Sequence, residues 1–395
     1  MNLSEKAAIP AVAGPLQVKA ALAAYFAIIG VLSPYLGLYL EYLELNAGQI
    51  ALLLALPQAT RIVAPPIWGW LADYSRNPAL ILKLSSGVMV LSMLALLAVK
   101  ASPFGIAMAL LSFYIFSAAQ IPLVETFTLS VANGNSGAYG AMRVWGSIGF
   151  ISMVMLFGFL LDLFGKMSVP WGLVVLSIGL FAICNSFNPL PRGSPSVLAP
   201  ATPLLPSFLK APVLWHFASC TLMVFAHSGL YSFYSLFLAN EGYSSTAIGA
   251  LWAVGVLAEM IWFNYQQRYF TRYSARAIII FCTLVAALRF TAIGALAGWG
   301  TGWLAALAML LLQTTHAFTF AAHHSAVMSL MHKWFSAAQQ SRAQATFVAL
   351  VYGIGGAAGA LVAGQLWQHV SPAAVFYGAA VAASISVVFA FLAKR

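Results

Sequence analysis

Nine ionisable side chains lie inside hydrophobic stretches that are each long enough to cross a bilayer. They are Arg61, Glu125, Arg143, His227, Glu259, Arg289, His316, His323 and His324. An ionisable group at membrane depth costs about 3 kcal/mol or more, so it normally faces a cavity or a partner. Carboxylates and imidazoles exchange protons, and guanidinium groups bind anions. These residues therefore indicate a path for a solute or for protons.

Glu259 and Arg289 are expected at similar depth on adjacent helices. Glu259 lies about 13 residues into its span and Arg289 about 14 residues into the next span, which runs in the opposite direction. At 1.5 Å per residue, each lies roughly 20 Å from its entry face. An ion pair between them is then either purely structural or a site where Glu259 binds and releases a proton.

His316 is predicted to join this pair. It shares one helical stripe with Gln313, Phe320 and His323, because steps of three and four residues keep to one face. Beside Glu259, His316 would complete a proton relay, whereas a lone histidine in a helix is usually a packed donor. His324 points off this stripe and is assigned to packing or to the interface.

Glu125 and Arg143 form a second candidate pair, both roughly 8–9 Å from the same membrane face. The segment around Arg143 contains small residues that allow close helix approach, and Trp145 offers a ring for stacking. Arg61 is a third cation in the membrane. Three arginines against two glutamates favour an anionic solute, although gating networks also use arginines. We assign Glu125, Arg143, Arg61, Trp145 and His323 to solute binding.

The elements that hold these groups are predicted to be membrane-spanning helices. The chain is 62% hydrophobic and only 7% charged, whereas soluble domains are about 25% charged. About twelve spans of roughly 20 residues or more are expected. Their limits are 18–40, 47–71, 79–99, 104–131, 139–162, 169–187, 211–239, 246–267, 275–297, 302–331, 341–366 and 372–392. The fold class is therefore an all-α membrane protein.

The net charge of +10 is a topology signal rather than a sign of nucleic-acid binding. One side of the membrane carries Lys6, Lys19, Arg76, Lys83, Arg192, Lys210, Arg268, Arg272, Arg276, Lys333, Arg342, Lys394 and Arg395. The other side carries only Lys100 and Lys166. Because basic residues gather on the cytoplasmic side, both termini are expected there, in a bacterial inner membrane.

The chain repeats itself at an offset of 198 residues. Segment 37–53 matches segment 235–251, and the same offset places Arg61 on Glu259 and Glu125 on His323. This pattern predicts two pseudo-symmetric six-helix halves, 1–187 and 211–395. The proline-rich segment 188–210 is predicted to be a semi-extended cytoplasmic linker.

A short motif follows the second span. Gly69-Trp-Leu-Ala-Asp73-Tyr-Ser-Arg76 resembles the loop signature of the major facilitators, although it lacks the glycine before the arginine. That resemblance assigns gating roles to Asp73 and Arg76. The alternative is an ordinary basic loop.

Further motifs extend this resemblance over nearly the whole chain. They are Leu32-Ser-Pro-Tyr-Leu-Gly-Leu-Tyr-Leu40, Trp68-Gly-Trp-Leu-Ala-Asp73, Tyr139-Gly-Ala-Met-Arg143-Val-Trp-Gly-Ser-Ile-Gly149, Gly255-Val-Leu-Ala-Glu259, Leu288-Arg289-Phe290 and His316-Ala-Phe-Thr-Phe320. In this order they resemble the phenylpropionate-permease-like branch of the major facilitator superfamily, which is related to lactose permease and to nucleoside–proton symporters. The resemblance implies a transporter with alternating access and proton-coupled uptake of a small solute, for this branch an aromatic carboxylate.

The resemblance also assigns roles to single residues. Lactose permease binds sugar with a glutamate in span four and an arginine in span five, and Glu125 and Arg143 occupy similar positions. It also has a histidine in span ten followed three residues later by a glutamate, where this chain has His316 and Thr319. Glu259 must then carry the proton, alone or shared with His316.

Other functions remain as alternatives at this stage. Within transport they are a sugar or nucleoside symporter and a proton-driven exporter. An intramembrane metal enzyme is a remote alternative, since the chain has no His-Glu-x-x-His spacing and no Walker loop. We expect no catalytic residue, no metal and no cofactor. The expected partners are the solute, protons and membrane lipids, and the expected functional unit is a monomer.

Overall fold

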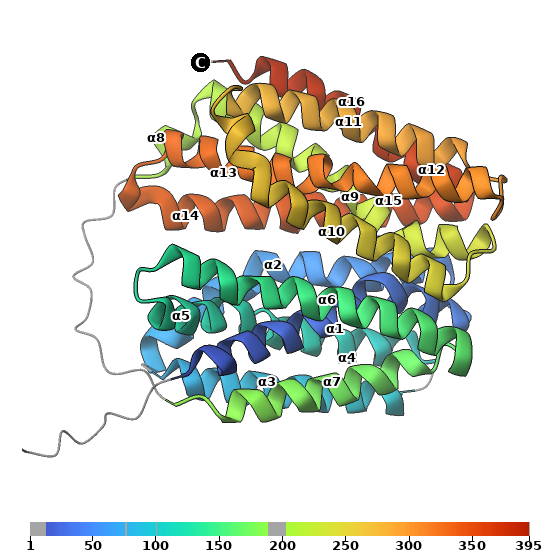
Figure 1. Ribbon diagram of the computed structural model, residues 1–395, viewed down its shortest axis with the longest axis horizontal. Helices are drawn as coiled ribbons and strands as arrows, with labels where there is room; N and C mark the ends of the chain where they lie inside the picture. The colour runs from blue at the N-terminus through green and yellow to red at the C-terminus, as the bar shows by residue number, and fades with distance from the viewer. Residues whose placement is uncertain (1–12, 76, 100, 189–202, 395) are drawn as a thin grey trace, which may run out of the picture.

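Helices make up the described part of the chain, which covers residues 13–75, 77–99, 101–188 and 203–394 of this computed structural model (Figure 1). The helices of the first half are α1 (Pro15–Tyr42), α2 (Ala47–Ser75), α3 (Pro78–Ala98), α4 (Pro103–Ser117), α5 (Gln120–Ala132), α6 (Ser136–Phe164) and α7 (Ser168–Asn185). Those that follow are α8 (Leu205–Phe208), α9 (Ala211–Asn240), α10 (Ser245–Phe270), α11 (Ala275–Ala295), α12 (Trp303–Thr314), α13 (His323–Trp334), α14 (Ala337–Phe347), α15 (Gly356–His369) and α16 (Pro372–Leu392). Two π-helices, η1 (Ala317–Ala322) and η2 (Val348–Gly355), lie among them.

Twelve spans of these helices are long and apolar enough to cross a membrane, which confirms the predicted fold class. The predicted limits agree with them closely, as for 211–239 against Ala211–Asn240. Several helices begin where the sequence supplies a cap. Asn77, Ser102 and Ser371 each accept a backbone hydrogen bond at a helix start, and a proline follows in the first turn.

The spans alternate between two ends of the bundle. We call the end where α1 and α9 begin and where α7 and α16 finish the linker end, and the opposite end the far end. Figure 1 shows α1–α7 as one layer and α9–α16 as another. These layers are the two six-helix halves that the internal repeat predicts.

The segment between the halves lies largely outside the described residues, since only 188 and 203–210 of the predicted linker are described. Its last part contains the short helix α8 rather than extended chain. The Gln339 side-chain amide on α14 donates to the carbonyl of Pro203 at 2.7 Å and to the Ser207 hydroxyl at 3.2 Å. The end of the linker is therefore attached to the second half.

Three spans are interrupted. The fourth is divided into α4 and α5, and Pro122 in the first turn of α5 lacks the N–H that a continuous helix would use. The tenth span contains η1 and the eleventh contains η2, both of which have wider turns with i→i+5 hydrogen bonding. Neither π-helix is visible in the hydrophobic pattern.

The register of the repeat changes along the chain, and the offset is already 200 from Pro103 to Trp303, where α4 and α12 begin. The offset is 198 from Ala47 to Ser245, where α2 and α10 begin, but 202 from Ala132 to Trp334, where α5 and α13 end. The sequence match of Glu125 with His323 at an offset of 198 is therefore not a structural equivalence. Extra residues in the second half displace it.

The two halves are in contact at the far end. The Asp162 carboxylate on α6 accepts hydrogen bonds from the backbone N–H groups of Ser245 and Thr246, both at 2.8 Å, and from the Thr246 hydroxyl at 2.7 Å. These groups form the first turn of α10, so a first-half carboxylate caps a second-half helix. Lys166, in the loop after α6, donates to the Ser245 hydroxyl at 3.4 Å. Burial lowers the pKa of the Lys166 ammonium, and Asp162 and Glu41 partly oppose that shift.

Close packing of α6 on α10 depends on two glycines. A Cβ atom on Gly158 would lie 2.7 Å from the Ser245 carbonyl oxygen, and one on Gly249 would lie 2.6 Å from the Val154 carbonyl oxygen. A second contact joins α2 and α15, where the Gly48 N–H donates to the Gln368 side chain at 2.9 Å. The hydrogen bonds named here between the halves lie on the far-end side.

Candidate functional site

A buried polar chain crosses the second half at mid-depth. His316, at the junction of α12 and η1, lies between Glu259 on α10 and Arg289 on α11. His316 Nε2 is 3.0 Å from Glu259 Oε1, and Arg289 Nη1 is 2.9 Å from His316 Nδ1. Arg289 also donates to the Thr319 hydroxyl at 3.0 Å and to the Gln313 side-chain oxygen. Arg289 is only 1% exposed and His316 7% exposed.

This geometry fixes the proton on the imidazole. Arginine only donates, so His316 Nδ1 must accept, and the single ring proton is on Nε2. That N–H faces the Glu259 carboxylate. A second proton on His316 would set an N–H of the ring against an N–H of Arg289. While Arg289 stays in place, Glu259 is therefore the group in this hydrogen-bonded set that can take up a further proton.

The predicted direct ion pair of Glu259 with Arg289 is replaced by a bridged one. Glu259 bonds to the neutral His316 ring, while Glu125 forms an ion pair with Arg143. Glu259 is still within Coulombic range of Arg289. The depth estimate was correct, but it gave no information on the ring between the two groups.

A column of stacked rings leads from His316 toward the linker end. Phe320 stacks on His316 with centroids 5.5 Å apart, and His324 follows Phe320 at 6.5 Å, each with an interplanar angle of 13°. The prediction that His324 points off this stripe was wrong, since its ring packs on Phe320. The π-helix η1 occupies 317–322 and has wider turns than a regular helix. Phe320 and His324 therefore stay aligned with His316, whereas a regular helix would align His323 with it.

His323 is turned away from this column. It is 7% exposed, and its Nε2 is buried without a hydrogen-bond partner. His227 on α9 is also buried, and its Nδ1 lies 2.8 Å from the Met223 carbonyl oxygen. His323 is therefore buried in the second half, and its role in solute binding stays a prediction.

Arg61 brings the first half to the end of the ring column. Its guanidinium lies over the Tyr352 ring, 5.5 Å from the centroid, and the Tyr352 hydroxyl is 3.3 Å from His324 Nδ1. Arg61 is on α2 and Tyr352 on η2, so this contact joins the two halves near mid-depth. The sequence singled out Arg61 but gave no signal for Tyr352.

Glu125 and Arg143 form the predicted pair nearer the linker end. Arg143 Nη1 is 3.0 Å from Glu125 Oε2, and the Tyr139 hydroxyl donates to the other carboxylate oxygen. The Arg143 and Glu125 side chains are 40% and 25% exposed. Trp145 is also exposed, and its ring lies 6.0 Å from the Lys19 ammonium. Gly149 allows the close approach of α6 to α1 that the sequence predicts, since a Cβ there would lie 2.1 Å from the Ala23 carbonyl oxygen.

The proposed gating residues Asp73 and Arg76 are not tested, because the Asp73 side chain and all of Arg76 lie outside the described residues. The backbone corrects one point. The segment predicted as a loop after residue 71 continues as helix α2 to Ser75.

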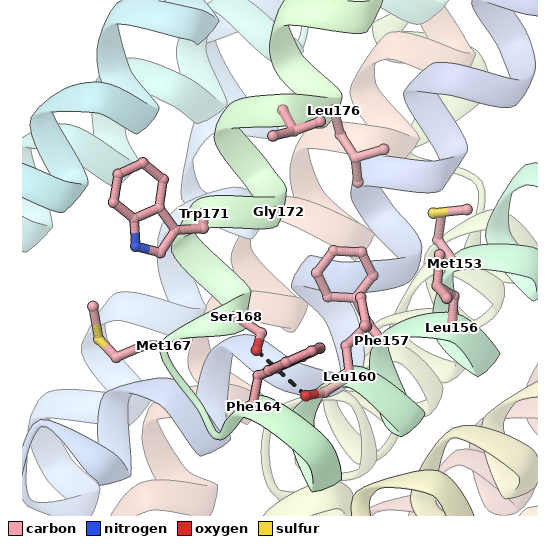
Figure 2. Close-up of a pocket in the computed structure, with 11 residues that line it drawn as sticks. Met153, Leu156, Phe157, Leu160, Phe164, Met167, Ser168, Trp171, Gly172 and Leu176 are labelled. Carbon is pink, nitrogen blue, oxygen red and sulfur yellow. Dashed lines mark hydrogen bonds between the residues drawn. The ribbon is translucent and has the colours of Figure 1, made fainter.

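A groove of about 530 Å³ lies elsewhere, between α6 and α7 in the first half (Figure 2). Its lining is almost entirely apolar and includes Phe157, Leu160, Trp171 and Leu176, with Ser168 as the polar exception. It contains none of the ionisable candidates, and its walls are membrane-spanning helices. We therefore separate it from the solute site. No group of three or more potential metal ligands occurs within the part of the chain that the structure describes.

Sequence reasoning did not assign Tyr231 or Thr319 to the site, because aromatic residues at helical spacing are more often packing residues. The Tyr231 hydroxyl lies 3.4 Å from His316 Nε2, and its ring stacks on Trp252 at 5.9 Å. Tyr231 belongs to an aromatic run in α9 whose other members, such as Phe233 and Tyr234, are buried packing residues. A run of similar rings gives no signal that one of them faces a polar chain.

Comparison with known proteins places this geometry among transporters. The model of the MFS_1 like family matches residues 16–378. The chain is 27% identical to the probable 3-phenylpropionic acid transporter of Escherichia coli (strain K12) over 357 residues, which covers 87% of this chain and 89% of the relative. It is 26% identical to the maltose permease of Geobacillus stearothermophilus over 68% of each chain.

The fold also matches a solved structure. A mutant of the nucleoside transporter NupG superposes with a TM-score of 0.82 over 95% of this chain and 98% of that one, at 18% identity. With twelve apolar helices and relatives that are all transporters, the protein is a multi-pass membrane transporter and not an enzyme. Since the family model matches most of its length, the chain belongs to the MFS_1 like family.

Proposed function

We propose that the protein is a proton-coupled symporter that imports a small organic anion, with Glu259 as the proton carrier. The observation that carries this proposal is the buried chain from Glu259 through His316 to Arg289. It holds an acid at mid-depth in a transporter, next to an imidazole whose other nitrogen is already occupied. Arg289, His316 and Tyr231 face this acid from α11, the α12–η1 junction and α9, and His324 lies within its Coulombic range.

Charge balance supplies the coupling. When Glu259 is ionised, its charge offsets that of Arg289 in a medium where charges interact strongly. A proton on Glu259 removes this offset and leaves Arg289 and Arg61 as net positive charge near mid-depth. An anionic solute restores the balance, so the proton and the anion each favour the binding of the other.

An aromatic carboxylate is the proposed solute. The relative named for 3-phenylpropionic acid is similar over most of both chains. The rings of Tyr231, Trp252, Phe320 and Tyr352 surround the charged groups of this chain. Rings of this kind pack against an aromatic solute, and the cations hold its carboxylate.

A neutral sugar is the second candidate. The Glu125–Arg143 pair with Tyr139 offers acceptors and donors suited to hydroxyl groups, and one relative is named as a maltose permease. Uptake of labelled 3-phenylpropionate and maltose by the same proteoliposomes decides between the two.

We propose that the linker end is cytoplasmic, in a bacterial inner membrane, because most basic residues lie there. The halves touch at the far end and expose Glu125 and Arg143 toward the linker end. In this orientation, the structure corresponds to an inward-facing state of an alternating-access cycle.

The Glu259→Gln variant tests the coupling. The amide keeps the shape but carries no exchangeable acid proton, so the variant should exchange 3-phenylpropionate across proteoliposomes at the parent rate. It should fail to accumulate the solute under an imposed pH gradient. Glu44→Gln, an acid in a far-end loop, is the matched control and should accumulate normally. Accumulation by Glu259→Gln equal to that of the parent would contradict the proposal.

A further inference from the structure

The three intramembrane arginines differ in how many of their N–H donors are already used. Arg143 is neutralised by Glu125 at 3.0 Å. Arg289 is 1% exposed and donates to Gln313, His316 and Thr319. Within the described residues, Arg61 makes no hydrogen bond and no ion pair, and its described contact is the face of the Tyr352 ring. Arg61 is also exposed.

A free guanidinium at this depth needs an anion. Arg61 is 14 residues from the far-end start of α2 and 14 from its linker-end finish, so it lies roughly 20 Å from both ends. A charge there costs about 3 kcal/mol or more unless it is paired or solvated. Glu125 pairs with Arg143 and Glu259 bonds to His316, so neither of these carboxylates pairs with Arg61. Arg61 is exposed and can therefore bind an anion that enters from outside the protein.

The surroundings of Arg61 are aromatic and come from both halves. Tyr25 on α1 and Tyr231 on α9 lie within Coulombic range of Arg61, and Tyr352 lies beneath it. The Tyr25 hydroxyl is 3.3 Å from that of Ser117, which holds its ring in place. Phenol rings around a guanidinium match a solute that has one carboxylate and one aromatic ring.

The backbone is built to bring α2 against η2 at this point. A Cβ on Gly353 would lie 2.5 Å from Ile62, and one on Gly356 would lie 3.0 Å from Gln58. Both glycines therefore allow an approach that places Arg61 over Tyr352. The buried Gln58 side-chain oxygen, one turn before Arg61, has no hydrogen-bond partner. This oxygen only accepts hydrogen bonds, so it is a partner for donors and not for a carboxylate.

We propose that Arg61 is the residue that binds the carboxylate of the solute. Tyr352 is then a positioning residue that holds the guanidinium where α2 of the first half meets η2 of the second. This inference rests on the proposed function for the class of solute. It goes further in two ways. It assigns the carboxylate to Arg61 instead of the Glu125–Arg143 pair, and it builds the carboxylate site from residues of both halves. A solute bound there is connected to the His316 column, because the Tyr352 hydroxyl contacts His324 and His324 stacks on Phe320.

Equilibrium binding of an acid and its amide tests the assignment. The probes are 3-phenylpropionate and 3-phenylpropionamide, measured by calorimetry on purified full-length protein without any gradient. The parent should bind the acid more tightly, and Arg61→Gln should weaken acid binding about tenfold or more while it changes amide binding little. Arg268→Gln is the matched control, because it removes an exposed guanidinium that also lies over a tyrosine ring, and it should keep the preference for the acid. Arg143→Gln tests the rival site, and on this proposal the preference for the acid persists in it.

The Tyr352 role has its own readout. Tyr352→Phe keeps the ring face and should keep the preference, whereas Tyr352→Leu should weaken acid binding by about two- to fivefold. Equal Tm values for parent and variants show that folding is unchanged. The inference is overturned if Arg61→Gln keeps the preference, if Arg143→Gln loses it instead, or if the parent binds both probes equally. These binding measurements need no proton gradient. They can therefore support the Arg61 assignment even if the Glu259→Gln test contradicts proton coupling, and they can contradict it even if that test supports coupling.

Discussion

At the scale of single residues, the structure shows how a carboxylate and a guanidinium can share the membrane interior without touching. His316 lies between Glu259 and Arg289 as a neutral ring that donates on one side and accepts on the other. Each charge keeps a hydrogen bond, and Arg289 gains further acceptors in Gln313 and Thr319. A buried arginine in such a setting is stabilised by several neutral dipoles as well as by the more distant acid.

A prediction at this scale concerns the tautomer of His316. Selective ¹⁵N labelling of histidine should show Nε2 protonated and Nδ1 unprotonated at neutral pH, because Nδ1 accepts from Arg289. Arg289→Ala should remove this restriction and allow the other tautomer or the doubly protonated ring. His323 is the internal comparison, since its Nε2 has no partner. A protonated Nδ1 in the parent would show that the hydrogen-bonded arrangement of Glu259, His316 and Arg289 is not the resting state.

At the scale of elements, the site depends on two departures from the regular helix. The π-helix η1 keeps His316, Phe320 and His324 in one column, and η2 presents Tyr352 to α2. At the crossing of α6 and α10, glycines allow the two helices to pack closely, because any side chain there would clash with backbone atoms. Wide turns thus place the reactive side chains, and small residues close the far end.

A glycine substitution tests the second of these points. Gly249→Val should push α10 away from α6, because its Cβ would lie 2.6 Å from the Val154 carbonyl oxygen. We expect the far end to open, which raises the rate at which a cysteine near the Asp162 contact reacts with a water-soluble maleimide. Gly179→Val on α7 is the matched control, since a Cβ there meets nothing within 4 Å. An unchanged labelling rate in Gly249→Val would show that this crossing does not hold the far end closed.

At the scale of the whole molecule, the two halves meet at the far end and leave the Glu125–Arg143 pair exposed. The hydrogen bonds that join the halves at the far end are mostly between single side chains and backbone groups. Each is worth about 1 kcal/mol, so together they can be exchanged for other contacts during a transport cycle. The direction of that cycle depends on which end faces the cytoplasm.

Cysteine labelling tests the orientation. Glu41→Cys at the far end should react with a membrane-impermeant maleimide on intact cells, and Thr271→Cys at the linker end should react only after permeabilisation. Both positions are exposed. The native cysteines Cys184, Cys220 and Cys282 are buried and provide a low background. The opposite pattern would place the linker end outside and would reverse the proposed direction of transport.

The sequence predicts the frame of this molecule well, because apolar length alone defines each span. It also predicts Glu125 beside Arg143 and Glu259 beside His316, since residues at equal depth on neighbouring helices are limited to few partners. These predictions needed only the rise per residue and the alternation of the spans.

The parts that could not be predicted share a physical cause. A π-helix has no signature in hydrophobic periodicity, so His323 was predicted on the stripe with His316 and Phe320 and His324 off it, whereas His324 stacks on Phe320. Contacts across the seam, such as Arg61 with Tyr352, join residues from different halves and depend on how the halves dock. Depth along a helix carries no information on that arrangement.

The extra residues of η1 and η2 have a consequence for the origin of the fold. A duplicated six-helix unit would begin with identical chemistry in both copies, yet here the tenth and eleventh spans have 32 and 33 residues against 30 and 29 in their counterparts. Small insertions in one copy are enough to turn side chains to a new face without new helices. The duplication thus preserved the scaffold, and the longer tenth and eleventh spans of the second copy hold the His316 column and Tyr352. Arg61 and Glu259 stand at matched positions, so these two residues differ by substitution and not by insertion. Two ancestrally equal copies became partners with different tasks.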